Sequence, residues 1–88
     1  MQPNFQPSIR SALMRVEPAR MTVGVSRGTW HAQVLAGLLP KPVKVGARAC
    51  AVPVRELEAV NAYRIAGRSD DEIKALVSRL HAERRLDA

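Results

Sequence analysis

The placement of glycines and prolines in the middle of the chain constrains its fold more than any other feature, because it fixes where a helix can begin and end. Gly24 can adopt the positive φ that a sharp turn between two helices needs. Ser26 follows, and its hydroxyl can accept a backbone N–H from a first helical turn. Gly37 ends that helix, and Pro40 and Pro42 prevent it from resuming. We therefore predict a short, isolated helix between Ser26 and Gly37.

The side chains of this short helix divide into an inward-facing and an outward-facing set. Trp30 and Val34 recur at helical spacing, so they are predicted to face inward. We interpret Trp30 as a core anchor and not as a stacking platform for a base. The outer faces, mainly toward the N-terminal end of the helix, are predicted to carry Arg27, Gly28, Thr29, His31 and Ala32.

After the helix the chain has the pattern of a hairpin. Residues 43–45 alternate apolar and basic side chains as a strand does. Gly46 and Ala47 supply a turn, and residues 49–52 can return as a second strand. The pattern therefore predicts a two-stranded basic ribbon.

A second short helix is predicted to precede the first. Pro18 suits the first turn of a helix, where its missing N–H costs nothing, and this places the helix at residues 17–23. Two short helices joined by a glycine-containing turn form a helix-turn-helix motif. With the basic ribbon behind it, the unit has the outline of a winged helix-turn-helix.

The last third of the chain predicts two further helices. Pro53 marks the start of one and Gly67 its end. Ser69 and Glu72 then have the spacing of a capping box at the start of another helix. Its apolar residues recur at i, i+3, i+4 and i+7, and they are Ile73, Leu76, Val77 and Leu80. We predict that this stripe packs on the preceding helix, with self-association between two copies as the alternative.

The predicted fold class is mainly α with a small two-stranded β wing and a C-terminal amphipathic helix. At 88 residues the chain is one domain. We divide it into a flexible N-terminal arm (1–12), the winged helix-turn-helix domain (13–67) and a C-terminal helix that packs on the domain or on a neighbouring copy (68–88).

Other sequence features limit where the protein can work. Cys50 is the single cysteine, so there is no disulfide framework, as is typical of a reducing cytoplasm. No apolar run approaches the roughly 20 residues needed to span a bilayer. The N-terminus also lacks the layout of a signal peptide.

The charge is unevenly distributed along the chain. The net charge is +6, yet residues 1–55 hold eight basic residues against the single acid Glu17. Residues 68–88 hold five basic and five acidic residues. A basic region without matching acids is typical of a protein that binds a polyanion.

Nothing in the sequence indicates an enzyme, a metal site or a cofactor. His31, Cys50 and His81 are far apart and lack the spacing of metal ligands. The acidic residues 70–72 are accounted for by the capping box. No glycine-rich phosphate loop with a Lys-Ser/Thr ending is present.

Three segments between about Leu13 and Val60 resemble the AlpA-like and excisionase-like branch of the MerR-type winged-helix superfamily. They are Val23-Gly24-Val25-Ser26-Arg27-x-Thr29, then Gly37-Leu38-Leu39-Pro40-Lys41-Pro42-Val43-Lys44-Val45-Gly46-Ala47-Arg48, and Val54-Arg55-Glu56-Leu57-Glu58-Ala59. The resemblance implies a small protein of a prophage or mobile element, in the bacterial cytoplasm and associated with the nucleoid. It also implies double-stranded DNA as the partner, an integrase as a possible second partner, and possible head-to-tail self-association on DNA.

A helix-turn-helix presents the N-terminal end of its second helix to the major groove. The expected groove contacts are Arg27, Gly28, Thr29 and His31, although His31 is equally compatible with a surface histidine that has no role. The expected contacts of the wing and its flanks with the DNA backbone or minor groove are Lys41, Lys44, Arg48 and Arg20. About five phosphate contacts predict a slope of log K against log salt near −4 to −5.

Three functions follow as hypotheses. The first is an excisionase, or recombination directionality factor, that binds and bends attachment-site DNA so that an integrase runs excision. The second is a winged-helix transcriptional regulator of excision or integrase genes. The third is a protein-interaction module, such as an antitoxin or phage adaptor, that uses the stripe from Ile73 to Leu80.

Overall fold

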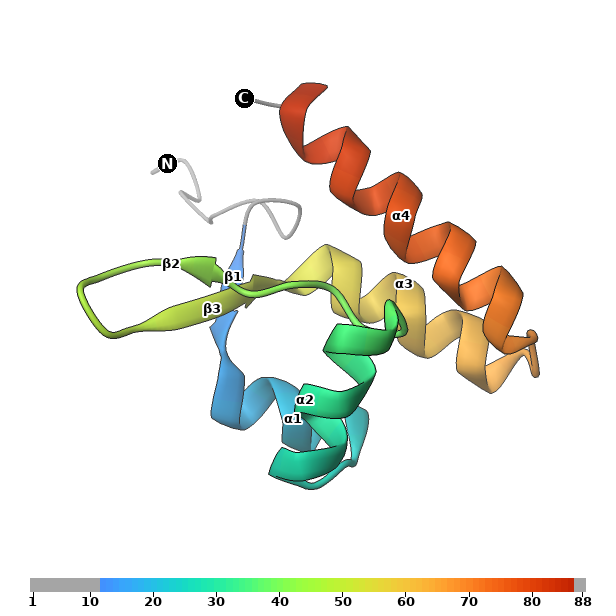
Figure 1. Cartoon of the computed structure of the whole chain (residues 1–88), viewed down its shortest axis with the longest axis horizontal. Helices are drawn as coiled ribbons and strands as arrows, with labels where there is room; N and C mark the ends of the chain where they lie inside the picture. Colours follow the sequence, from blue (N-terminus) through green and yellow to red (C-terminus); the bar gives the residue numbers. More distant parts are fainter. Residues whose placement is uncertain (1–11, 87–88) are drawn as a thin grey trace, which may run out of the picture.

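The computed structural model describes residues 12–86 of the chain, so the predicted N-terminal arm lies almost wholly outside the described residues. Within that range the fold is mainly helical, with four helices and a small antiparallel sheet (Figure 1). The elements in chain order are β1 (Leu13–Arg15), α1 (Val16–Val23), α2 (Arg27–Ala36), β2 (Val43–Lys44), β3 (Cys50–Pro53), α3 (Val54–Ile65) and α4 (Asp70–Leu86).

The turn between α1 and α2 is formed as the sequence predicts. Gly24 has φ of 86°, in the left-handed region, and its N–H donates to the Arg20 carbonyl at 2.8 Å. Ser26 caps α2, since its Oγ accepts a hydrogen bond from the Thr29 N–H at 3.2 Å. Gly37 ends α2 with φ of 81°. These three residues confirm the predicted pair of short helices and its connection.

The sheet differs from the prediction, because it has three strands instead of two. Its order is β1-β3-β2, and β1 pairs antiparallel with β3 so that Arg15 faces Ala51. β2 pairs with the other edge of β3, with Lys44 opposite Cys50. The three residues of β1 are too few to show a period of two, and their strand conformation comes from pairing with a segment far along the chain. The predicted ribbon is present as β2, β3 and their connecting turn, which we call the basic hairpin.

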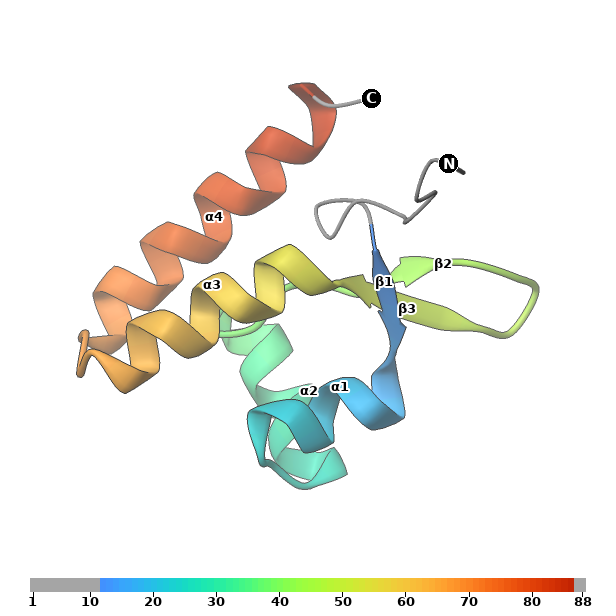
Figure 2. The same cartoon turned by 180° about the vertical axis from the view of Figure 1, so that it is seen from behind.

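The core lies where α1, α2, α3, α4 and β3 meet. Its largest fully buried side chains include Trp30, Leu39, Val52, Leu57 and Val60. Trp30 is only 1% exposed, which confirms its interpretation as a core anchor. The basic hairpin extends away from this core, and Figures 1 and 2 show it projecting from the body on the side opposite the α3–α4 turn.

Helix α4 packs along α3, and both views show the two helices side by side (Figures 1 and 2). The capping box is present, because the Glu72 N–H donates to Ser69 Oγ at 3.2 Å and Glu72 Oε1 accepts from the Ser69 N–H at 2.9 Å. The predicted apolar stripe is buried at 3%, 3%, 2% and 7% exposure for Ile73, Leu76, Val77 and Leu80. The stripe therefore packs on the preceding helix, as the sequence predicts.

Candidate nucleic-acid interface

The N-terminal half of α2 presents its outer side chains to solvent. Arg27, Gly28, Thr29 and His31 are all exposed, whereas Trp30 between them is buried. The buried tryptophan fixes the rotation of the helix about its axis. The four residues expected to reach a groove therefore lie on accessible surface, as a contact with a partner requires.

Arg27 is the longest of these side chains, and it lies over α1. Its Nε donates to Glu17 Oε2 at 3.0 Å, while its side chain remains 73% exposed. Water screens so open an ion pair, so the guanidinium can exchange it for another acceptor. The hydrogen bonds from Arg20 and then from Arg27 lower the pKa of the Glu17 carboxyl below its ordinary value of 4.5.

Arg20, which was expected to contact the DNA backbone, hydrogen-bonds within the turn between α1 and α2. Its guanidinium donates two hydrogen bonds to Glu17, at 3.0 and 3.2 Å, and a third to the Val25 carbonyl at 3.1 Å. Its side chain is only 24% exposed. The ion pair has a local cause, since Glu17 and Arg20 are three residues apart on one helix and face each other.

The outer face of α2 also carries an apolar side chain, Leu35, which was not among the predicted site residues. Leu35 is 89% exposed, the most exposed of the large hydrophobic residues in the described chain. It stands at i+7 from Gly28, so the two share a face with Ala32, which is also exposed. The signal was present in the sequence, because Leu35 is out of phase with Trp30 and Val34.

The basic hairpin places its cations on an exposed projection. Lys44, Arg48 and the turn between them are exposed, and the Val45 N–H donates to the Ala49 carbonyl at 2.9 Å to close the turn. The side chains of Lys44 and Arg48 have no hydrogen-bond or ion-pair partner among residues 12–86. Their charges are therefore available to a ligand.

Lys41 lies just before the hairpin, and α4 holds its backbone. The Lys41 N–H donates to His81 Nε2 at 3.1 Å, and the Lys41 carbonyl accepts from Arg84 at 2.7 Å. The Arg84 guanidinium in turn donates two hydrogen bonds, of 2.6 and 2.9 Å, to the carboxylate of Glu56, which has no exposed surface. Burial, followed by the nearby charge of Arg84, lowers the pKa of His81 below its ordinary value of 6.5.

These contacts were not predicted from the sequence, because the hydrogen-bonded partners are 28 to 43 residues apart in the chain. One signal was available, since Glu56 stands four residues before the core residue Val60 and therefore shares its face. A charge on the inward face of a helix predicts a buried ionic partner.

The C-terminal end of α2 is fixed by an arginine of α3. The Arg64 guanidinium donates to Gln33 Oε1 at 2.8 Å and to the Leu38 carbonyl at 3.2 Å. With the buried Trp30, these contacts hold α2 in one orientation relative to the body. The exposed face of α2 is therefore presented by a rigid support.

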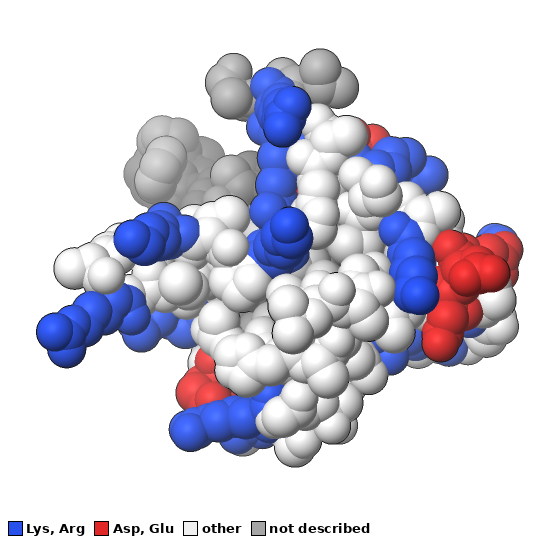
Figure 3. Space-filling model, viewed as in Figure 1, with Lys and Arg blue, Asp and Glu red and all other residues white. Residues whose placement is uncertain are grey.

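The charges separate over the surface. In Figure 3 basic side chains project from the basic hairpin at the left of the view, while acidic side chains gather at the right edge, by the start of α4. The acids of that first turn are Asp70, Asp71 and Glu72. A polyanion approaching the hairpin therefore meets positive charge, while three of the acidic residues lie at the far end of the molecule.

Within residues 12–86 no group of His, Cys, Asp and Glu side chains is arranged to hold a metal ion. No helix in the same range is long and apolar enough to cross a membrane. Comparisons with known proteins found no family model, no curated protein and no solved structure that matches the chain.

Proposed function

We propose that this protein is a small winged helix-turn-helix DNA-binding protein that acts as an excisionase. The observation that carries the proposal is the pairing of two exposed features on one support. These are the capped N-terminal end of α2 and the basic hairpin with its partnerless Lys44 and Arg48. DNA binding of this kind needs a helix that fits into a groove and basic side chains that contact the phosphates beside that groove.

In the proposed complex α2 enters the major groove by its N-terminal end. Arg27 leaves Glu17 and binds guanine O6 and N7 in a bidentate manner, a contact worth about 1–3 kcal/mol of discrimination. Thr29 and His31 reach a base edge or a phosphate, and Gly28 allows the backbone to approach closely. Leu35 adds an apolar contact suited to a thymine methyl group.

The basic hairpin acts as the wing in this proposal. Arg48 lies in the turn and meets the minor groove or a phosphate, while Lys44 and Lys41 meet phosphates. The protein performs no chemistry itself. It offsets the free energy of bending DNA with these contacts and so presents an attachment site to an integrase, with neighbouring copies bound head to tail.

Footprinting on DNA that contains an attachment region and the promoter of an adjacent integrase gene tests the proposal. An excisionase protects several tandem sites inside the attachment region and bends that DNA. A single protected palindrome at the promoter would instead establish the transcriptional regulator, which uses the same surface. Absence of salt-dependent binding to any duplex would overturn both.

The protein-interaction module receives less support from the fold. Its proposed docking stripe, from Ile73 to Leu80, is buried against α3. An antitoxin or adaptor that used this face would first have to detach α4 from its own core. A stable complex with another protein and no binding to duplex DNA would favour it.

A further inference from the structure

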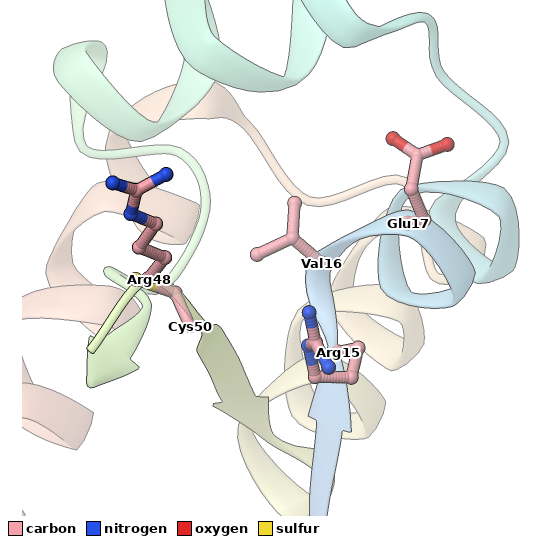
Figure 4. A pocket seen from close by; sticks show the side chains of 5 residues that line it. All are labelled: Arg15, Val16, Glu17, Arg48 and Cys50. Carbon is pink, nitrogen blue, oxygen red and sulfur yellow. The ribbon is translucent and has the colours of Figure 1, made fainter. Parts of the chain in front are cut away.

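A hollow of about 250 Å³ separates the start of α1 from the basic hairpin. Its lining comes from β1, the start of α1, the hairpin turn and β3. The lining residues are Arg15, Val16, Glu17, Arg48 and Cys50 (Figure 4). Two of these five side chains are arginines from segments far apart in the chain. In Figure 4 Arg48 lies to the left of Val16 and Arg15 lies below it.

Both arginines in the hollow carry uncompensated charge. The side chains of Arg15 and Arg48 have no hydrogen-bond or ion-pair partner among residues 12–86. Glu17 also lines the hollow, but its two carboxylate oxygens already accept hydrogen bonds from Arg20 and Arg27. Two cations that face one hollow repel each other until an anion lies between them.

The sheet holds the two arginines in a fixed relation. Arg15 is paired with Ala51 of β3 across one edge, and Arg48 precedes β3 with one residue between them. The backbones of both residues are therefore tied to β3, that of Arg15 by strand pairing and that of Arg48 along the chain. An arrangement built before the ligand arrives loses little conformational entropy on binding, and guanidinium groups suit the oxygens of a phosphate.

We propose that this hollow seats one phosphate group of the DNA backbone between Arg15 and Arg48. The inference rests on the proposed DNA-binding function and deepens it, because it adds Arg15 and makes the two arginines share one phosphate. The seated phosphate fixes the position of the backbone relative to α1 and the basic hairpin. It thereby sets the register in which α2 meets the bases.

Salt dependence of duplex binding tests whether the phosphate is shared. The variants are Arg15→Ala, Arg48→Ala and the double variant, with Arg85→Ala on the exposed side of α4 as the control for lost charge. A shared phosphate predicts that the double variant flattens the slope of log K against log salt by about one relative to the unaltered protein. Independent contacts predict a change of about two, and that result would overturn the shared seat.

Cys50 supplies a second measurement, because it lines the hollow and is the only cysteine in the sequence. A neutral alkylating reagent such as iodoacetamide should modify Cys50 more slowly when saturating duplex is bound. The double variant, held at a duplex concentration that saturates it, should lose this protection. Arg85→Ala should keep it.

These measurements distinguish failure of the phosphate seat from failure of DNA binding. If the protein binds duplex with a steep salt slope but Cys50 stays equally reactive, the seat is wrong and the DNA-binding proposal stands. If inorganic phosphate at matched ionic strength protects Cys50 but duplex does not, the hollow binds a free anion and the inference fails. If the protein binds no duplex, both proposals fall together.

Discussion

At the scale of single residues, the most consequential contact is one that the surface does not reveal. Glu56 is completely buried and is held by Arg84, whose side chain is 25% exposed. The same arginine fixes the Lys41 carbonyl, so one side chain ties α4, α3 and the approach to the basic hairpin together. A buried carboxylate tolerates this position only because its charge is paired and hydrogen-bonded.

Replacing Arg84 should therefore destabilise the protein strongly. Arg84→Ala leaves the Glu56 carboxylate buried without a partner, and we expect a loss of about 3–5 kcal/mol in the free energy of unfolding. Urea denaturation monitored by circular dichroism measures this loss. Arg85→Ala, on the adjacent exposed position, should change stability by less than about 0.5 kcal/mol. Equal stability of the two variants would contradict the assigned role of the ion pair.

His81 predicts a dependence of stability on pH. Its Nε2 accepts the Lys41 N–H, which requires a neutral ring, and burial holds its pKa below the ordinary value of 6.5. In the unfolded chain His81 binds its proton at higher pH than in the folded protein. Stability from this group is therefore fully present above pH 6.5 and falls as the pH drops from there through the folded-state pKa.

Urea denaturation at several values between about pH 7.5 and about pH 5 measures this effect. The carboxyls of Glu17 and Glu72 have their pKa lowered below 4.5 by arginine and backbone hydrogen bonds, so they stay ionised in this window. His81→Gln retains an acceptor for Lys41 but does not titrate, and it should flatten the profile. An unaltered profile in His81→Gln would assign the pH dependence to another group.

At the scale of elements, α2 divides its chemistry by position. Its first turn carries Arg27 and the cap from Ser26, its interior face carries the buried Trp30, and its outer face ends in the exposed Leu35. Arg64 fixes the far end of the helix through Gln33. The inner face of α2 is thus held by the core and by Arg64, and its outer face remains accessible to a partner.

The role proposed for Arg27 predicts a change in sequence preference. Arg27→Ala should weaken binding to the preferred duplex by about 1–3 kcal/mol while leaving binding to unrelated duplexes nearly unchanged. Competition assays with the preferred site and scrambled duplexes measure the ratio. Equal weakening on every sequence would assign Arg27 to the phosphate backbone instead.

The role proposed for Leu35 is tested by altering the DNA one methyl group at a time. Replacing thymine by uracil at the contacted position of the preferred site removes the methyl group and should weaken binding of the unaltered protein. Leu35→Ala should bind both duplexes alike, since the exposed side chain that senses the methyl group is gone. If the variant still distinguishes the two duplexes, another residue makes that contact.

At the scale of the whole molecule, α4 is part of the core and not an appendage. Four of its residues lie in the same buried cluster as Trp30, Leu39 and Val52. Its side chains His81 and Arg84 also hold the segment that leads into the basic hairpin. The charge of the molecule is separated as well, with the acids of the first α4 turn far from the hairpin (Figure 3).

Deleting the chain after Gly67 should therefore unfold the protein and not merely reduce cooperative binding. Each buried apolar side chain contributes about 1.5–3 kcal/mol, so the loss of four approaches the total stability of a small domain. Circular dichroism and thermal denaturation of the truncated chain measure this. A cooperative unfolding transition in the truncated chain would show that residues 1–67 fold without α4.

The local features of this fold follow from short stretches of the sequence. The turn at Gly24, the cap at Ser26, the helix end at Gly37 and the capping box at Ser69 each depend on residues within one helical turn. Conformational limits and hydrogen bonds over that range can be recognised from the order of residues alone. The helices were consequently predictable, with boundaries close to those observed.

Contacts between segments that are distant in the chain could not be predicted in this way. The three residues of β1, Leu13–Arg15, show no pattern that predicts their pairing with β3. The contacts of Arg84 with Glu56 and Lys41 depend on how α3 and α4 pack. The same packing buried the α4 stripe and brought Arg15 to the hollow beside Arg48. Such contacts join residues that are far apart in the chain, and they form only when the whole chain packs together.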